Sequence, residues 1–187
     1  MTHAPRSRRR VLLEYGLTLL LAVAIAYAAE ALAVKPFAIP TASMANTVQP
    51  GDRLLIDRVS YRFHAVRRGD VIVFGGHGPI PLLKRVVGLP GDRLSLSNGR
   101  LFVNGQPASQ AWVRRLDGRL EPTLPGPDAF LPWSLAHPFV VPAGQYFVMG
   151  DNRTDSDDSR YWGTVSRGQI IGKAFFIYWP PQHMKGL

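Results

Sequence analysis

The chain has 187 residues, 46% of them hydrophobic, which is enough for one substantial folded domain together with a membrane anchor and excludes a disordered tail. Lysine and arginine number 22 against 13 aspartate and glutamate, and the formal charge of +9 favours an anionic partner, either lipid headgroups or nucleic acid. No cysteine is present, so disulfides, thiol catalysis and thiolate metal sites are excluded.

A basic tail and a long apolar segment open the chain. Residues 1–10 contain four arginines, and the only charged residues in 11–34 are Glu14 and Glu30. A helix over 11–34 would be about 36 Å long, enough for a hydrocarbon core of about 30 Å. We therefore expect a cytoplasmic tail over 1–10 and one transmembrane helix over 11–34, with lipid accounting for much of the excess positive charge.

A cleavable signal peptide is the alternative interpretation of this segment, because small-residue sites such as Ala29-Glu30-Ala31 occur near its end. The apolar cores of signal peptides are about 7 to 15 residues long, clearly shorter than 11–34, and this favours a retained anchor. Basic residues beside a membrane helix stay in the cytoplasm, so we expect 35–187 to lie outside it.

The region 35–187 contains short stretches rich in β-branched and aromatic residues, separated by Gly, Pro, Asn and Asp. Stretches of this length and composition are typical of strands joined by tight turns, which predicts an almost entirely β domain. The expected strands are Arg53–Val59, Val71–Phe74, Leu82–Val87, Leu94–Leu96, Leu101–Val103, Phe139–Val141, Tyr146–Met149 and Ile170–Tyr178.

Turn residues divide this region further. Gly51-Asp52, Gly69-Asp70 and Gly91-Asp92 each precede an apolar stretch and are expected to be structural turns, whereas Gly150-Asp151 follows a strand and requires another explanation. Asn98-Gly99 predicts a hairpin. The proline-rich segment after it indicates a smaller, partly irregular β insertion at about 97–140.

Two residues in this region suggest hydrolytic chemistry. Ser43 follows the apolar segment closely, in the run Pro40-Thr41-Ala42-Ser43-Met44. Lys84 stands between Leu82 and Val86 at strand spacing, and a lysine on an apolar strand face is costly unless it is neutral or paired. Burial would lower its pKa and leave a neutral amine that could take the proton of a serine hydroxyl.

Four segments resemble the sequence boxes of bacterial type I signal peptidases, in the family's order and after a membrane helix. They are Pro40–Met44, Gly51–Tyr61, Lys84–Asp92 and Gly150–Gly163. The resemblance implies an antiparallel coiled-sheet catalytic domain in the bacterial cytoplasmic membrane, with no cofactor. Its activity would be that of a serine endopeptidase that removes the signal peptides of exported preproteins.

By this resemblance Ser43 is the nucleophile and Lys84 the general base, a Ser-Lys variant of serine catalysis. Thr41 matches the residue whose hydroxyl completes an oxyanion hole with the Ser43 N–H, and Ser156 matches the residue that orients the lysine amine. Supporting roles, rather than reacting ones, fall to Asp151 and to an ion pair of Asp158 with Arg160.

The first box departs from the family pattern at two positions. Asn46 stands where the family usually has proline, and Val48 where it usually has leucine. Neither change removes a reacting group, and we expect the change at Asn46 to leave the turn less rigid.

Family substrates carry small residues at positions −1 and −3 before the cut. A peptide added beside a strand edge would place these side chains in shallow apolar pockets. Candidates for the pocket walls, chosen by proximity to the reacting residues, are Phe37, Ile39, Met44 and Leu83. The alternative for all four is ordinary core packing.

Other sites and functions find less support in the sequence. There is no dinucleotide or phosphate-loop pattern, and no histidine spacing typical of zinc, so no metal site is expected. A specialised peptidase that matures a pilin or conjugation protein is a close alternative. More distant ones are a DNA-binding regulator with a self-cleaving Ser-Lys domain, which would need a soluble N-terminal domain, and a non-catalytic membrane-tethered interaction protein.

Overall fold

The structure is a computed structural model that describes residues 8–76, 78–125 and 137–187, with the backbone alone for 28–33. The chain divides into two compact units, Met1–Lys35 and Pro36–Leu187. Residues 1–7 of the expected cytoplasmic tail and 126–136 of the expected insertion lie outside the described residues.

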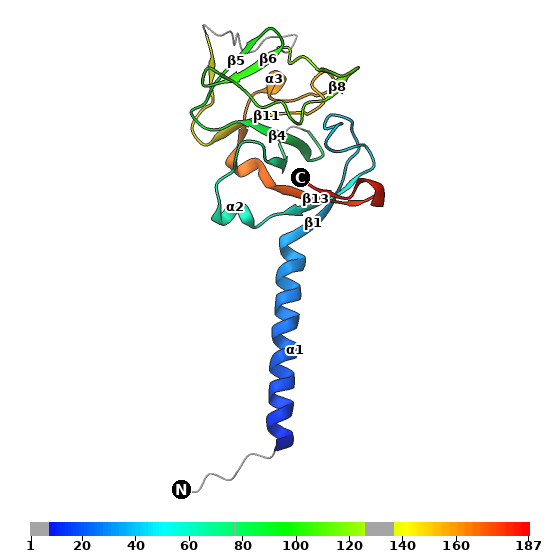
Figure 1. Cartoon of the computed structure of the whole chain (residues 1–187). Helices are drawn as coiled ribbons and strands as arrows, with labels where there is room; N and C mark the ends of the chain where they lie inside the picture. Colours follow the sequence, from blue (N-terminus) through cyan, green and yellow to red (C-terminus); the bar gives the residue numbers. More distant parts are fainter. Residues whose placement is uncertain (1–7, 77, 126–136) are drawn as a thin grey trace. The chain divides into compact units, whose positions relative to one another are not determined.

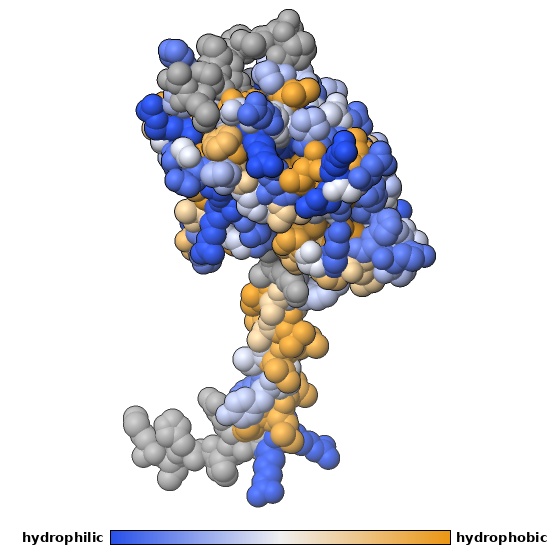
Figure 2. Space-filling view, turned by 45° about the horizontal axis from the view of Figure 1, so that its top comes forward, coloured by the Kyte–Doolittle hydropathy of each residue, from blue (hydrophilic) through white to orange (hydrophobic). Residues whose placement is uncertain are grey.

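The first unit is built around one long helix, α1, from Arg8 to Ala33. It begins three residues before the expected start at 11, because arginine is a good helix former and nothing in the run interrupts the helix. Its stretch Arg8–Tyr27 is long and apolar enough to cross a membrane. Figure 2 shows a surface that is mostly hydrophobic along this helix, with hydrophilic residues at one end.

The second unit is dominated by an antiparallel sheet with the strand order β1-β2-β13-β3-β4-β11-β12, in which β14 pairs with β13 (Figure 1). The bounds of its strands are β1 Val34–Ala38, β2 Arg53–Asp57, β3 Val71–Phe74, β4 Leu82–Gly88, β11 Gln145–Met149, β12 Val165–Ser166, β13 Ile170–Trp179 and β14 Lys185–Gly186. Register shifts interrupt three of the ladders, β13 with β2, β13 with β3 and β11 with β4. Such bulges bend the strands and increase their twist.

A second, four-stranded sheet has the order β10-β5-β6-β7, and a separate hairpin joins β8 to β9. In Figure 1 β5 and β6 lie on the far side of β4 and β11 from β13. The bounds are β5 Arg93–Ser97, β6 Arg100–Val103, β7 Gln106–Pro107, β8 Arg115–Leu116, β9 Arg119–Leu120 and β10 Phe139–Val140. The expected insertion at about 97–140 thus falls largely in this sheet and the hairpin, although the first strand of the sheet begins at Arg93.

Short helices complete the unit: α2 Ser60–Phe63, α3 Ser159–Trp162, and the 3-10 helices η1 Arg167–Gln169 and η2 Pro181–His183. The mostly β architecture is confirmed, and a strand occurs in every stretch where the sequence predicts one.

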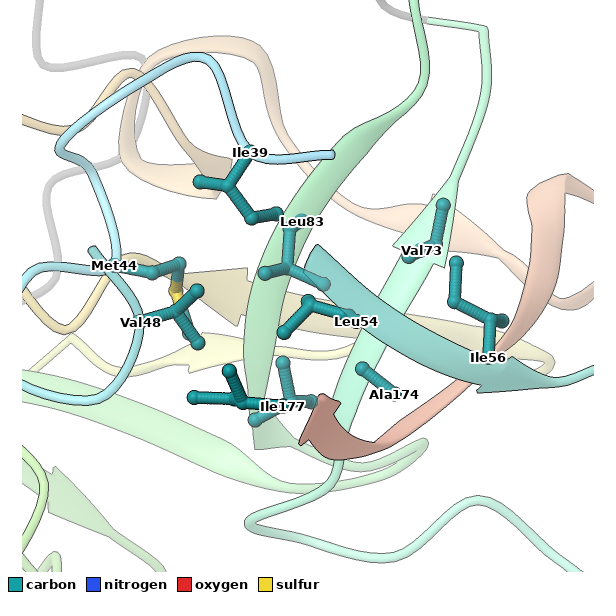
Figure 3. Packing of buried hydrophobic residues seen from close by; sticks show 10 residues of the cluster. Ile39, Met44, Val48, Leu54, Ile56, Val73, Leu83, Ala174 and Ile177 are labelled. Atoms are coloured by element: carbon teal, nitrogen blue, oxygen red, sulfur yellow. The ribbon is translucent and has the colours of Figure 1, made fainter. Parts of the chain in front are cut away.

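Three clusters of buried side chains hold the sheets together. One packs the loop before β2 against β2, β3, β4 and β13 through residues that include Met44, Leu54, Leu83 and Ile177, as Figure 3 shows. Another fills the opposite face of β3 and β4, and includes Phe74 and Val86. The third cluster joins β4 and β11 to β5 and β6. Strand β4 therefore contributes to all three.

The three Gly-Asp turns expected to be structural share one geometry. Each glycine has a positive φ, which side-chain-bearing residues rarely adopt. Each aspartate carboxylate is buried and accepts the backbone N–H of the residue three positions earlier, closing the turn before a strand. The pairs are Asp52 with Gln49, Asp70 with Arg67, and Asp92 with Leu89.

The predicted hairpin is also present. Asn98 and Gly99, with φ of 49° and 71°, connect β5 to β6. Positive φ at both central positions is the requirement of a type I′ turn, and an Asn-Gly pair meets it with little strain.

Candidate active site

The loop that carries Ser43 is held between two buried anchors, Ile39 and Val48. Tight backbone hydrogen bonds close it, from Ala45 N to Ala42 O at 2.8 Å and from Val48 N to Met44 O at 2.9 Å. Because both anchors belong to the core beneath the loop, the position of the serine is fixed by packing.

Lys84 lies in the middle of β4 and reaches this loop. Its Nζ donates a hydrogen bond to Ser43 Oγ at 2.6 Å. The lysine is 3% exposed and the serine 8% exposed. The sequence predicted an amine shielded by aliphatic neighbours beside a hydroxyl, and the structure brings these two atoms together although 41 positions separate them.

Burial lowers the pKa of Lys84 below its ordinary value, because an ammonium loses hydration in this environment. The negative charges of Asp158 and Asp157 oppose this effect without overcoming it. The neutral amine is thus more accessible near neutral pH than in an exposed lysine. At 2.6 Å it is within the range in which a base can take a hydroxyl proton.

Thr41 is exposed beside the serine, with its Oγ1 3.4 Å from Ser43 Oγ. A hydroxyl at this place can donate to an oxygen atom bound next to the serine. The structure therefore brings Thr41, Ser43 and Lys84 into one site.

The fourth Gly-Asp dipeptide lies against this site. Continuing the β4–β11 register beyond the pair Met149–Arg85 places Gly150 opposite Lys84. A Cβ at Gly150 would overlap Ser43 O and Ser156 Oγ, so the position has no room for a side chain. Asn152, which follows the Gly150-Asp151 dipeptide, donates from its backbone N to Ser43 O and from its Nδ2 to Ala42 O, both at 3.1 Å.

Ser156 is buried beside Gly150, but its hydroxyl is not bonded to the lysine amine. It donates to Asp158 Oδ2 at 2.8 Å. The Asp158 carboxylate also accepts the Gly150 N–H at 3.0 Å and forms a two-point ion pair with Arg160, with a closest distance of 2.8 Å. Asp158 thereby joins Ser156 to the strand end that faces Lys84.

Asp151 belongs to a separate buried ion pair. It faces Arg85, the neighbour of Lys84 on β4, at 2.7 Å and also accepts from the Thr47 hydroxyl. The Trp112 ring lies 4.8 Å from the Arg85 guanidinium. This cluster fastens the end of the serine loop to β4 and to the segment 112–114.

Three further buried residues support the site, and the sequence patterns did not reveal them: Glu121, Thr123 and Arg153. Glu121 accepts from Arg153 N at 2.6 Å, and Thr123 Oγ1 accepts from Arg153 Nη1 at 2.7 Å. Burial lowers the pKa of Arg153 to about 10, so it remains charged at neutral pH. Glu121 and Thr123 stand in the proline-rich segment, where no periodicity marks a residue as buried.

Asn46 differs from the expectation of a looser turn. Its φ is 98°, which the ring of a proline cannot adopt, and its Nδ2 donates to Trp112 O at 3.0 Å. The asparagine therefore links the serine loop to the segment 112–114.

An apolar cleft of about 30 Å³ opens beside the reacting atoms. All four residues proposed as pocket walls line it, together with Ser43 and Lys84: Phe37, Ile39, Met44 and Leu83. The same four also belong to the core or pack against it, as the alternative interpretation expects, and their role as substrate pocket walls stays a prediction. In Figure 3 Ile39 and Leu83 extend toward one another at this edge of the core.

Metal-ligating side chains do not gather at the site. Over the part of the chain that the structure describes, no group of three or more His, Cys, Asp or Glu residues could hold a metal ion.

Comparison with known proteins gives a consistent assignment. Residues 12–179 match the sequence profile of the signal peptidase family, peptidase S26. Signal peptidase I of Leptolyngbya laminosa is 36% identical over 175 residues, covering 88% of this chain and 76% of that protein. Signal peptidase IB of Staphylococcus aureus is 31% identical over 180 residues, covering 95% and 94%.

A solved structure is also similar, that of a signal peptidase I from Enterococcus faecalis V583. It is 30% identical, has a TM-score of 0.45, and the match covers 59% of this chain and 97% of that one. On the extent of the sequence matches, the chain belongs to the signal peptidase family, peptidase S26.

Proposed function

We propose that this protein is a membrane-bound signal peptidase I that cleaves the N-terminal signal peptides of exported preproteins, with Ser43 as nucleophile and Lys84 as general base. The observation that carries the proposal is the 2.6 Å contact of Lys84 Nζ with Ser43 Oγ in a buried site. The lowered pKa of Lys84 supplies the neutral amine that the mechanism needs.

In the first step Ser43 Oγ bonds to the scissile carbonyl carbon while its proton passes to Lys84 Nζ. The carbonyl oxygen becomes an oxyanion, to which the Ser43 N–H and the Thr41 hydroxyl donate; one such donor is worth about 3 kcal/mol in other enzymes. The C–N bond then breaks, and the Lys84 ammonium protonates the leaving amine. Lys84 then deprotonates a water molecule, whose oxygen bonds to the ester carbonyl carbon. The C–O bond to Ser43 breaks, and the Lys84 ammonium returns the proton to Ser43 Oγ.

Ser156 orients the Lys84 amine in this mechanism. Its hydroxyl hydrogen is donated to Asp158, which leaves its lone pairs to accept from an ammonium. The Asp158–Arg160 pair keeps Ser156 in place, and the Asp151–Arg85 pair keeps the serine loop in place. These four charged residues support the site without contacting the substrate.

The apolar cleft receives the small side chains before the cut. A volume of about 30 Å³ has room for a methyl group beside Ser43. This favours alanine and similar residues at −1, with −3 entering the same apolar wall when an extended peptide lies along the strand edge.

The anchor and its orientation complete the proposal. The segment 11–34 spans the membrane once, with the basic tail in the cytoplasm and 35–187 outside it as the catalytic domain, carrying an insertion at about 97–140. Lipid is the second partner. Within the second unit Phe63 and Trp179 are 78% and 50% exposed, which suits contact with an apolar surface.

The direct test is cleavage of a purified preprotein by the detergent-solubilised full-length chain, with the cut located by mass spectrometry. Ser43→Ala should reduce kcat/KM by about 10⁴- to 10⁶-fold, as loss of the nucleophile does in other serine hydrolases. Ser97→Ala, on β5, is the matched control and should cleave normally. Cleavage by the Ser43→Ala variant at the wild-type rate contradicts the proposed mechanism.

A panel of unrelated preproteins extends this test to the range of substrates. Processing of most of them indicates a general signal peptidase. Processing of one or two indicates the specialised pilin or conjugation peptidase.

A further inference from the structure

The serine loop separates two clefts of different character. Thr41, Ser43 and Met44 line the apolar cleft, whereas Ala42, Ala45 and Asn46 line another. Neighbouring residues of one loop thus line two different clefts. We call the part of this loop between the two clefts, which carries Ser43, the crest. A peptide whose scissile bond reaches Ser43 has one part on each side of this crest.

The second cleft is large and polar. Its volume of about 450 Å³ is within the range of about 300–1,000 Å³ that is typical of ligand sites. Besides the three loop residues it is lined by Gln49, Pro50, Arg114, Arg115, Asn152 and Asp155. Two arginines face one aspartate, so its walls carry a net positive charge.

Arg114 is positioned by the active site itself, whereas Arg115 Nη1 donates to Gly118 O at 3.2 Å within the β8–β9 hairpin. Arg114 N donates to Asp151 O at 2.9 Å, and Trp112 O accepts from Asn46 Nδ2 at 3.0 Å. Within the described residues, the Arg114 guanidinium has no hydrogen bond or ion pair. The backbone is therefore fixed while the charged group is left available to a ligand.

Other residues that line this cleft are hydrogen-bonded to the serine loop. Asn152 holds the carbonyls of Ala42 and Ser43, and both Asn152 and Ala42 line the cleft. A group bound here is adjacent to the reacting bond rather than remote from it.

We propose that this polar cleft binds the first residues of the mature segment, the part of the preprotein that leaves with the new amino terminus, and that Arg114 and Arg115 favour acidic side chains there. The inference rests on the proposed function, in which the small residues before the cut occupy the apolar cleft. The leaving part then crosses the crest into the polar cleft, where two cations attract carboxylates and repel lysine and arginine.

The experiment measures kcat/KM of the detergent-solubilised full-length protein on preproteins that are identical through position +1. They differ only in carrying Asp, Asn or Lys at both +2 and +3. Each exposed charge pair changes a binding constant by about 1.4- to 5-fold. The wild type should therefore prefer the Asp substrate over the Lys substrate by about three- to tenfold at low salt.

The double variant Arg114→Glu/Arg115→Glu should reverse this preference. Arg119→Glu is the matched control, because Arg119 belongs to the same β8–β9 hairpin but does not line the cleft. Arg119→Glu should keep the wild-type order of kcat/KM, with the Asp substrate highest, the Asn substrate intermediate and the Lys substrate lowest. Raising the salt to about 0.5 M should reduce the preference, since it shortens the range of the interaction to a few ångströms.

Equal kcat/KM values for the three substrates with wild-type protein overturn the inference, and so does a preference that survives the double charge reversal. A preference that Arg119→Glu removes equally also overturns it, because the general surface charge would then be the cause. These outcomes leave the proposed function intact. That proposal fails separately if none of the substrates is cleaved or if Ser43→Ala cleaves them.

Discussion

Lys84 and Arg85 are neighbours on β4, both cationic and both buried, yet they point to opposite faces of the strand and have different surroundings. Arg85 lies against the Asp151 carboxylate at 2.7 Å, with a tryptophan ring at 4.8 Å. Lys84 contacts a serine hydroxyl and has no carboxylate within ion-pair distance among the described residues. Burial therefore has opposite results on the two faces, a stable ion pair and a proton acceptor.

The difference lies in the partner rather than in the degree of burial. The two residues are 3% and 7% exposed, so their loss of hydration is similar. A carboxylate in contact with Arg85 replaces the lost hydration, whereas Asp158 and Asp157 influence Lys84 only from beyond contact distance. Replacing Lys84 should therefore affect activity, and replacing Arg85 should affect stability.

The largest expected effect comes from replacing Lys84 with a side chain that is permanently charged. Lys84→Arg places a guanidinium beside Ser43 that stays charged and cannot accept a proton. We expect kcat/KM for preprotein cleavage to fall by about 10²- to 10⁴-fold, the usual contribution of a general base. Lys173→Arg, at a half-exposed lysine paired with Asp70, is the control and should retain activity. Activity near wild type in Lys84→Arg would show that the amine is not the base.

Removing the arginine on the other face should affect stability instead. Arg85→Met leaves the Asp151 carboxylate buried without its cation, at a cost of about 3–5 kcal/mol in the free energy of unfolding. Denaturant unfolding of the detergent-solubilised chain, followed by tryptophan fluorescence, measures this cost. Arg68→Met is the control. Arg68 is 33% exposed and pairs with Asp92, and breaking this pair should cost about 1 kcal/mol in the free energy of unfolding. Equal losses in the two variants would contradict the contrast drawn here.

The smallest effect concerns pH. The proposed mechanism requires the neutral amine of Lys84, so kcat/KM should rise with pH and level off above the pKa of Lys84, which lies below the ordinary lysine value. The exposed Asp157 raises that pKa by favouring the ammonium. Asp157→Asn should therefore lower it and move the rising limb of the pH profile to lower pH.

Asp117→Asn changes the charge of the β8–β9 turn and should leave the profile unchanged. If Asp157→Asn also leaves the pH profile of kcat/KM unchanged, the rising limb of that profile does not reflect the titration of Lys84.

The strand pattern could be predicted because it depends on short stretches of sequence, whereas the pairing of Ser43 with Lys84, 41 positions apart, was expected from the resemblance of the four boxes to a known family. Val71–Phe74, for example, is a continuous run of β-branched and aromatic residues, which is the local pattern of a buried strand. The Gly-Asp turns were equally local, since glycine at positive φ and an aspartate that caps the turn are three positions or fewer apart.

The supports of the site could not be predicted in this way. Glu121 contacts Arg153, and Trp112 contacts Arg85, each across more than 25 positions of the chain, and the burial of Glu121 follows from the folded structure. The hydrogen bond of Ser156 to Asp158, in place of one to the lysine, likewise depends on where Arg160 and Gly150 lie in space. Tertiary contacts of this kind have no sequence period.

The left-handed backbone at Asn46 has a consequence for anyone who engineers this chain from its relatives. Consensus substitution, a common route to thermostability, would restore the proline usual at this position. Here that ring would demand a φ near −65° where the chain has 98°, and the tie to Trp112 would be lost. The residue most typical of the family is the one that this loop cannot accommodate without rebuilding the crest on which Ser43 sits.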